Sequence, residues 1–162
     1  TLKVLGRAVI SAAPAGLLIW VLANVPLSGQ TTLLTALTGF LDPFARRLGM
    51  DGCILTGFLL GLPANEIVVP IIIMTYMARG SLLEVEGVQL MQLFTANGWT
   101  WITAVSTLLF SLMHWPCSTT CLTIGKETKS AKWTLLSIAI PTGIGMAVCF
   151  LVASAARLLG LA

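Results

Sequence analysis

The sequence contains few charged residues, which make up 9% of its 162 positions, against about 25% in a typical soluble domain. Hydrophobic residues make up 57% of the chain, and the mean hydropathy is +0.96. Nine basic and six acidic side chains are too few to cover the water-facing surface of a globule of this length. The composition therefore excludes an ordinary soluble domain and predicts an all-α membrane protein.

Several functional classes lack the residues that they need. The basic residues stand at the ends of apolar runs, so the net charge of +3 does not indicate nucleic-acid binding. Gly57 and Gly61 are not followed by the Lys-Ser/Thr pair of a phosphate-binding loop. A single histidine, His114, gives little basis for an acyl-transfer triad. The four cysteines lie within apolar stretches, which indicates free thiols. We expect neither an enzyme nor a nucleic-acid-binding protein.

Two apolar runs are long enough to cross a bilayer, which takes about 20 residues. Ala8–Val25 follows Lys3 and Arg7, and Trp133–Ala156 follows the basic loop Lys126–Lys132. Basic loops favour the cytoplasmic side of a membrane. The sequence thus predicts a multi-pass protein whose Lys126–Lys132 loop faces the cytoplasm.

A third segment has the pattern of a helix that lies in the membrane interface. In Thr32–Leu48, leucine and phenylalanine recur at helical spacing, and Asp42, Arg46 and Arg47 stand between them. An apolar stripe opposite charged side chains is typical of an interfacial amphipathic helix. We expect this helix to lie parallel to the membrane, with a kink at Pro43.

Two further apolar segments are interrupted. Gly52–Met77 is cut at Pro63–Glu66, and the segment that begins at Trp101 is cut at His114–Thr119. Backbone at membrane depth leaves the helix only where protein or a water-filled cavity satisfies its polar groups. Paired interruptions of this kind indicate a midplane binding site in transporters. If both basic ends are cytoplasmic, one segment crosses fully and the other is re-entrant.

Glu66 and Cys117 are the residues at the interruptions that most strongly indicate chemistry. A carboxylate in mid-bilayer costs several kcal/mol unless it is paired, protonated or bound to a cation. Cys117 follows Pro116 directly, and a thiolate there suits a borderline-soft divalent metal such as Fe(II). In the alternative interpretation, Glu66 is protonated or lies in a loop near the surface, and Cys117 is simply packed.

The neighbours of these two residues could complete a mixed oxygen and sulfur ligand shell. Asn65, Ser118 and Thr119 supply oxygen ligands, and open helix ends add carbonyl groups. His114 is either a further ligand or a hydrogen-bonded residue at a helix end. We expect the two interruptions to meet, with Glu66 and Cys117 beside a cavity that admits Fe(II).

Both interrupted segments resemble one known family. Leu48–Gly52 with Gly57–Ile71 resembles the second Gate segment of the FeoB ferrous-iron transporters. His114–Thr120, with Lys126–Thr128 and Lys132-Trp133 after it, resembles the cysteine-bearing segment nearer the C-terminus of that family. The two motifs occur in the family's order, and the resemblance covers nearly the whole chain.

The resemblance implies an importer of Fe(II) in the inner membrane of bacteria or archaea. Glu66 matches the acidic residue of the Gate motif, and Cys117 matches the cysteine of the Pro-Cys segment, so both would belong to the ion path. Fe(II) would be the transported ion, with no tightly bound cofactor. The family's GTP-binding domain and first Gate half are missing, so residues 1–162 would form a single transmembrane domain that supplies half of the path.

The implied partners are therefore the lipid bilayer, the GTP-binding and first Gate parts, and further copies in a homo-oligomer. The first residue is threonine, and we expect a piece of a longer protein or a subunit that needs partners. The Gate segment also resembles nucleoside-recognition and spore-maturation membrane proteins. Two alternatives stay open for this reason: a gate for nucleosides or other small solutes, and a membrane scaffold subunit without transport.

Overall fold

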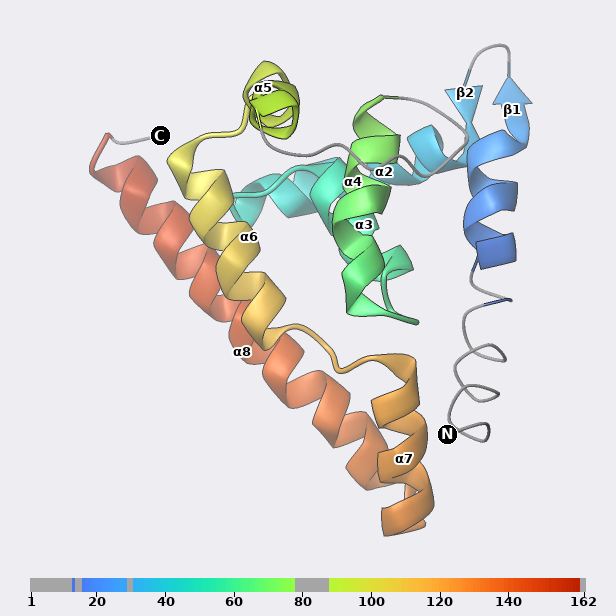
Figure 1. The fold of residues 1–162 in the computed structure, drawn as a ribbon. Coiled ribbons are helices and arrows are strands. Elements are labelled where there is room, and N and C mark those ends of the chain that lie inside the picture. The colour runs from blue at the N-terminus through green and yellow to red at the C-terminus, as the bar shows by residue number, and fades with distance from the viewer. Residues whose placement is uncertain (1–12, 14–15, 29–30, 78–87, 161–162) are drawn as a thin grey trace.

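The computed structural model describes residues 13, 16–28, 31–77 and 88–160. They are helical apart from one short antiparallel ladder, as the sequence predicts for the all-α class (Figure 1). Residues 16–24 are helical and lead into this ladder. The elements that follow are β1 (Pro26–Ser28), β2 (Thr31–Thr32), α2 (Leu33–Arg47), α3 (Gly52–Leu60), the 3-10 turn η1 (Asn65–Ile67), α4 (Val68–Tyr76), α5 (Val88–Ala96), α6 (Trp101–Met113), α7 (Ser118–Thr128) and α8 (Ala131–Leu158).

Helix α8 is long and apolar enough to cross a membrane, and it is the one such helix in the described part of the chain. Its 28 residues extend about 42 Å. The side that packs against protein carries small residues such as Gly145, Cys149 and Ala153, whereas Leu135 and Leu151 are each 65% exposed. Small residues facing protein and large apolar residues facing outward are typical of helices in lipid.

The two predicted spans therefore have different outcomes. Trp133–Ala156 is confirmed as part of one continuous helix that could cross a bilayer. Of Ala8–Val25, the structure describes residues 13 and 16–25, with a continuous helix over residues 16–24. The other positions of the predicted span lie outside the described residues.

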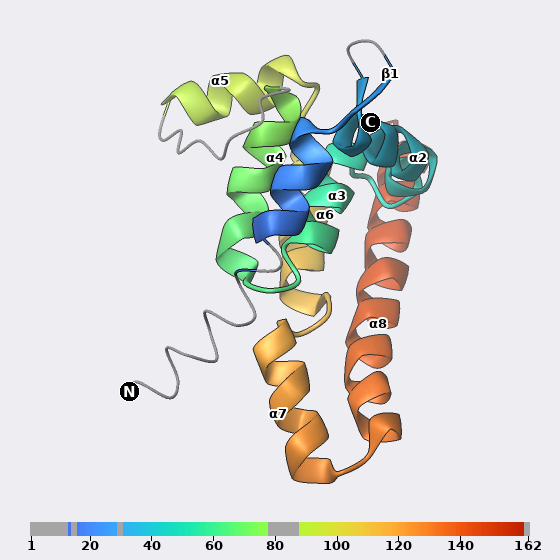
Figure 2. The same cartoon turned by 90° about the vertical axis from the view of Figure 1, so that its right-hand side faces the viewer.

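Helices α6 and α7 together pack along α8. A Cβ atom on Gly145 would lie 3.0 Å from Met113 Cβ, and Cys149 Sγ donates to the Ser106 carbonyl oxygen at 3.4 Å. Further along, α7 packs against the N-terminal part of α8. The chain thus continues in the same direction after the interruption that separates α6 from α7 (Figure 2).

Helices α3 and α4 instead form an antiparallel hairpin. Gly57 lies opposite Ile72 and Gly61 lies opposite Val68, so closely that an added Cβ would be 2.5 Å from Ile72 Cγ1 or 2.4 Å from Val68 Cγ2. Each helix has nine residues, or about 14 Å of helix. The start of α3 and the end of α4 thus lie at the same end of the hairpin (Figures 1 and 2).

Both predicted interruptions are present, and the structure distinguishes them by shape. Helix α3 ends at Leu60 and α4 begins at Val68, while α6 ends at Met113 and α7 begins at Ser118. The first is the tip of a hairpin, and the second is a lateral step in a segment that continues along α8. Insertion of the hairpin into a membrane as a re-entrant element stays a prediction.

The predicted amphipathic segment Thr32–Leu48 forms helix α2. Its C-terminal end has Gly49 in the left-handed region (φ +77°), where glycine avoids the steric cost of a Cβ. The amides of Gly49 and Met50 donate to the carbonyls of Arg46 and Ala45, which is the Schellman ending of a helix. Phe40 is 81% exposed, so apolar surface remains for lipid. The orientation of α2 parallel to a membrane stays a prediction.

The start of α2 is fixed by Thr32. Its hydroxyl accepts from the Thr35 amide at 3.4 Å, and the Thr35 hydroxyl accepts from the Thr32 amide at 2.9 Å. We expect Thr32→Ala to lower the free energy of unfolding by about 1 kcal/mol, because the Thr35 amide loses its acceptor at the start of the helix. Thermal unfolding in detergent measures the change, with Thr123→Ala on the exposed side of α7 as a control. An unchanged unfolding temperature would contradict this role.

Charged side chains of the described residues gather at the two ends of α8. The Arg157 guanidinium donates to the Arg46 carbonyl oxygen, and Arg46 pairs with Asp42 at 2.6 Å. At the opposite end, the turn between α7 and α8 carries the lysines of the predicted cytoplasmic loop. Among the acidic residues of the described chain, Glu66 lies at the tip of the hairpin and not at either end of α8.

Candidate functional site at the junction of the two interruptions

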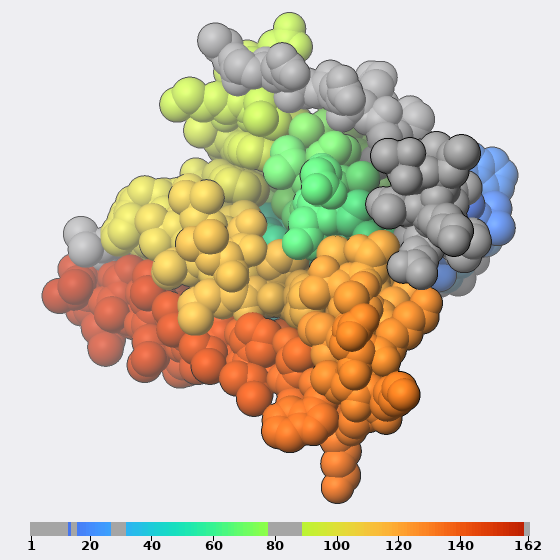
Figure 3. Space-filling view, turned by 60° about the horizontal axis from the view of Figure 1, so that its bottom comes forward, coloured from blue at the N-terminus to red at the C-terminus, as the bar shows by residue number. Residues whose placement is uncertain are grey.

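The two interruptions meet, as the sequence predicts. The amide of Ser118 donates to the carbonyl oxygen of Leu62 at 2.9 Å. Ser118 is the first residue of α7, whose amide has no partner within its own helix. The Leu62 carbonyl lies in the turn that follows α3. Each interruption therefore satisfies a polar backbone group of the other. Figure 3 shows α4, α6 and α7 adjoining on one face of the molecule.

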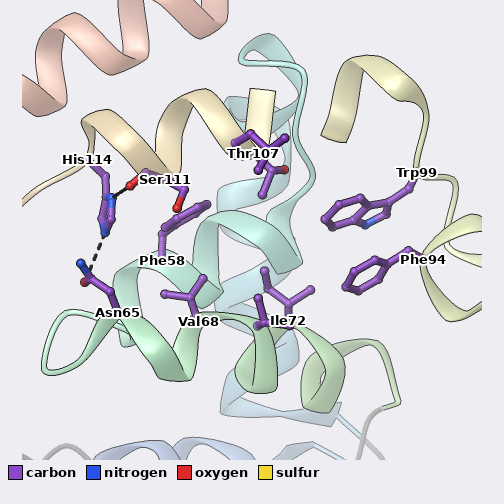
Figure 4. A pocket seen from close by; sticks show the side chains of 11 residues that line it. Phe58, Asn65, Val68, Ile72, Phe94, Trp99, Thr107, Ser111 and His114 are labelled. Atoms are coloured by element: carbon purple, nitrogen blue, oxygen red, sulfur yellow. Dashed lines mark hydrogen bonds between the residues drawn. The ribbon is translucent and has the colours of Figure 1, made fainter. Parts of the chain in front are cut away.

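His114 makes the side-chain contact between the interruptions. It is the C-cap of α6, with extended backbone (φ −71°, ψ 178°) that ends the helix two residues before Pro116. Its Nδ1 lies 2.9 Å from the Ser111 carbonyl oxygen, and its Nε2 lies 3.4 Å from Asn65 Oδ1. The ring is buried, and its centroid lies 5.1 Å from that of Phe58. Figure 4 shows both polar contacts.

Two cavities adjoin this contact. The first, of about 160 Å³, lies between the hairpin, α6 and the aromatic pair Phe94 and Trp99 (Figure 4). The second, of about 380 Å³, lies between the α6–α7 interruption and α8, where Pro141 lines it. Asn65, Ser111 and His114 line both cavities. These three residues therefore form a wall that the two cavities share.

Cys117 and Thr119 lie together at the start of α7. Cys117 Sγ is 3.1 Å from Thr119 Oγ1 and 3.1 Å from Thr120 Oγ1. The Ser118 hydroxyl is buried and has no hydrogen-bond partner in the described structure, and the same holds for Trp115 Nε1. An unsatisfied buried polar group costs about 1–3 kcal/mol, so the junction holds polar groups that a solute or water can satisfy.

The structure does not bring Glu66 and Cys117 into the two cavities at the junction. The Glu66 side chain is exposed on η1, and neither residue lines either cavity. Within the described ranges, no group of three or more His, Cys, Asp or Glu side chains is arranged to hold a metal. The contact of the two interruptions is confirmed, whereas the ligand role of these residues stays a prediction.

The sequence analysis named His114 but missed Thr107 and Ser111 of α6. Thr107, Ser111 and His114 line the first cavity together. They follow an i, i+4, i+7 spacing in an otherwise apolar helix, which places them on one face. This polar stripe in an apolar helix indicates a face that lines a cavity or contacts another polar segment. Phe58 had no such signal, because an aromatic residue in an apolar run is usually part of the core.

A polar chain at the open end of the hairpin positions the aromatic wall of the first cavity. The Tyr76 hydroxyl donates to Asp51 Oδ2, and Trp99 Nε1 donates to the Tyr76 oxygen at 2.7 Å. The Trp99 ring stacks on Phe94 with centroids 4.1 Å apart. Helix α5 and the start of α6 are thus tied to the hairpin.

Comparison with known proteins gives one match. The Gate model, described as nucleoside recognition, matches residues 5–131, more than half of the chain. No curated protein and no solved structure matches the chain. The Gate family occurs in FeoB proteins and nucleoside transporters, and together with the membrane-spanning length of α8 it indicates a membrane protein related to solute transport. The chain belongs to the Gate family.

Proposed function

We propose that this chain forms half of a transmembrane path for ferrous iron, with the junction of the two interruptions as its narrow point. The observation that carries the proposal is the direct bond between Leu62 and Ser118. It joins the turn after α3 to the start of α7, just beyond the end of α6. That end of α6 packs, through Met113, against Gly145 near the middle of α8. Polar backbone at such a depth is stable only beside protein or a water-filled cavity.

Iron is favoured because the segments that meet are the ones that resemble FeoB. The Pro63–Glu66 turn and the His114–Thr119 turn each carry one of the two motifs, and they lie side by side. Imidazole, thiol, hydroxyl and amide groups at one junction suit Fe(II), which accepts nitrogen, oxygen and sulfur ligands. Few simultaneous ligands suit transport, because the ion must also leave.

A membrane arrangement follows from this proposal. Helix α8 and the combined α6–α7 segment cross the bilayer, and the α3–α4 hairpin is re-entrant, in a multi-pass protein of the bacterial or archaeal inner membrane. Large apolar side chains on the outside of α8 face lipid or a partner. A GTP-binding part and a first Gate half complete the path, and copies of the whole assemble as a homo-oligomer.

A nucleoside is the second candidate solute, and the lining of the first cavity supports it. Phe58, Phe94 and Trp99 offer aromatic faces, and Asn65 and His114 offer hydrogen-bonding groups. Aromatic faces stack on bases, and amides bind base edges. The first cavity, of about 160 Å³, is smaller than the 300–1,000 Å³ that is typical of organic-ligand pockets, so its volume favours the ion. The second cavity, of about 380 Å³, reaches that range.

Uptake by the complete gene product that contains this chain tests the proposal. In cells without other ferrous-iron importers, we expect uptake of radioactive Fe(II) under reducing conditions and none of radioactive nucleosides. Glu66→Gln and Cys117→Ser should each lower the initial rate about tenfold, the lower end of the effect of removing groups that support a metal site. Cys53→Ser, at the start of α3, is the matched thiol control. Full uptake in both variants at equal membrane levels would remove these residues from the path, and nucleoside uptake without iron uptake would replace the proposal.

A further inference from the structure

The hydrogen bonds of His114 assign its ring protons. Nδ1 lies 2.9 Å from the Ser111 carbonyl oxygen, which can only accept, so Nδ1 carries a proton and donates it. In the neutral tautomer with its proton on Nδ1, Nε2 has a free lone pair.

That lone pair faces Asn65. Nε2 lies 3.4 Å from Asn65 Oδ1, and two acceptors cannot hydrogen-bond to each other. Two arrangements resolve the conflict: the amide turns its NH₂ group toward Nε2, or a cation lies between the two acceptors. For ligands about 2.1 Å from a tetrahedral ion, the separation of two ligand atoms is about 3.4 Å.

The surroundings match those of a metal-binding histidine. Such residues almost always donate their second ring N–H to a carbonyl or carboxylate, which fixes the ring, and Nδ1 of His114 does so to Ser111. His114 lines both the cavity of about 160 Å³ and the cavity of about 380 Å³. A cation bound there can be reached from either cavity.

We propose that His114 Nε2 and Asn65 Oδ1 form a two-ligand transfer site that passes a divalent cation from one cavity to the other. This rests on the proposed iron path and names the ligands at its narrow point. Without the ion, the Asn65 NH₂ group donates to Nε2 and closes the junction. When the ion arrives, that hydrogen bond breaks, the amide turns, and bonds from the metal to Nε2 and Oδ1 form; no proton leaves the protein. Water supplies the other ligands.

The transfer site also discriminates between metals. Imidazole favours Fe(II) over Mn(II), which prefers oxygen ligands and binds more weakly to a given site. The site has only two protein ligands, so the ion is held weakly enough to move on. A histidine with only a structural role would not change the preference of the path for Fe(II) over Mn(II).

The test compares Fe(II) and Mn(II) uptake by the complete gene product and its variants. His114→Gln replaces the nitrogen ligand with an amide. Asn65→Ala removes the second ligand at a position that is exposed. We expect Fe(II) uptake to fall about tenfold or more in both, and the ratio of Fe(II) to Mn(II) uptake to fall in His114→Gln. Thr123→Ala is the matched control, because Thr123 is exposed on α7 and lines neither cavity.

A binding measurement separates this inference from the proposed function. In the purified gene product under anaerobic conditions, Co(II) should give visible absorption of a nitrogen-ligated ion, and His114→Gln should abolish it. Unchanged Fe(II) uptake, metal ratio and Co(II) spectrum in the variants would overturn the transfer site while leaving the iron path intact. Absence of any Fe(II) uptake by the unaltered protein would overturn the iron path itself.

Discussion

Replacing Gly52 with alanine should lower the free energy of unfolding by about 3 kcal/mol, at the upper end of the cost of overpacking. An alanine Cβ would lie 2.2 Å from the Thr38 carbonyl oxygen and 3.1 Å from Asp42 Cα. Both are backbone atoms of α2, so no side-chain rotation relieves the overlap. The helices would have to separate, which weakens the bond from the Gly52 amide to Asp42 Oδ1, now 3.0 Å long.

Thermal unfolding of the purified protein in detergent, followed by tryptophan fluorescence, measures this effect. Gly39→Ala is the matched control on α2, because a Cβ there meets nothing within 4 Å. It should be neutral or stabilise by about 0.5–1 kcal/mol, the usual gain of alanine over glycine in a helix. If both variants unfold at the same temperature, the close contact of α2 with α3 is not required for stability.

Replacing Asp51 with alanine should cost about 2–3 kcal/mol, because the change removes two interactions at once. Asp51 Oδ1 caps α3 by accepting from the Ile54 amide at 2.8 Å. Its other oxygen accepts from Tyr76, which in turn accepts from Trp99. The loss of a helix cap alone costs about 1 kcal/mol, and the partly buried Tyr76 hydroxyl would lose its acceptor as well.

The same unfolding measurement separates the two contributions. Tyr76→Phe keeps the cap and removes the link to Trp99, so it should cost about 1 kcal/mol. Asp51→Asn keeps an oxygen for the cap, and its loss of stability should lie between those of Asp51→Ala and Tyr76→Phe. Equal stability of Asp51→Ala and Tyr76→Phe would show that the cap contributes nothing.

The interruptions themselves could be predicted from the sequence. Pro63 and Pro116 each stand in an apolar run beside polar residues, and proline lacks the amide that a helix needs. Their contact could also be expected, since unsatisfied backbone is costly in lipid and two interruptions can satisfy each other. The close packing of Gly57 and Gly61 against α4 was not predicted from the sequence.

The composition, the length of the α8 run and the positions of the prolines are local properties, so the sequence alone determined the membrane class, the helical content and the two interruptions. The tertiary structure decided which interruption reverses the chain and which continues along α8. It also decided that His114 faces Asn65, 49 positions earlier, and that Tyr76 joins Asp51 to Trp99. Those outcomes depend on which helix faces pack together, because helical spacing indicates only which residues share a face and not what that face meets.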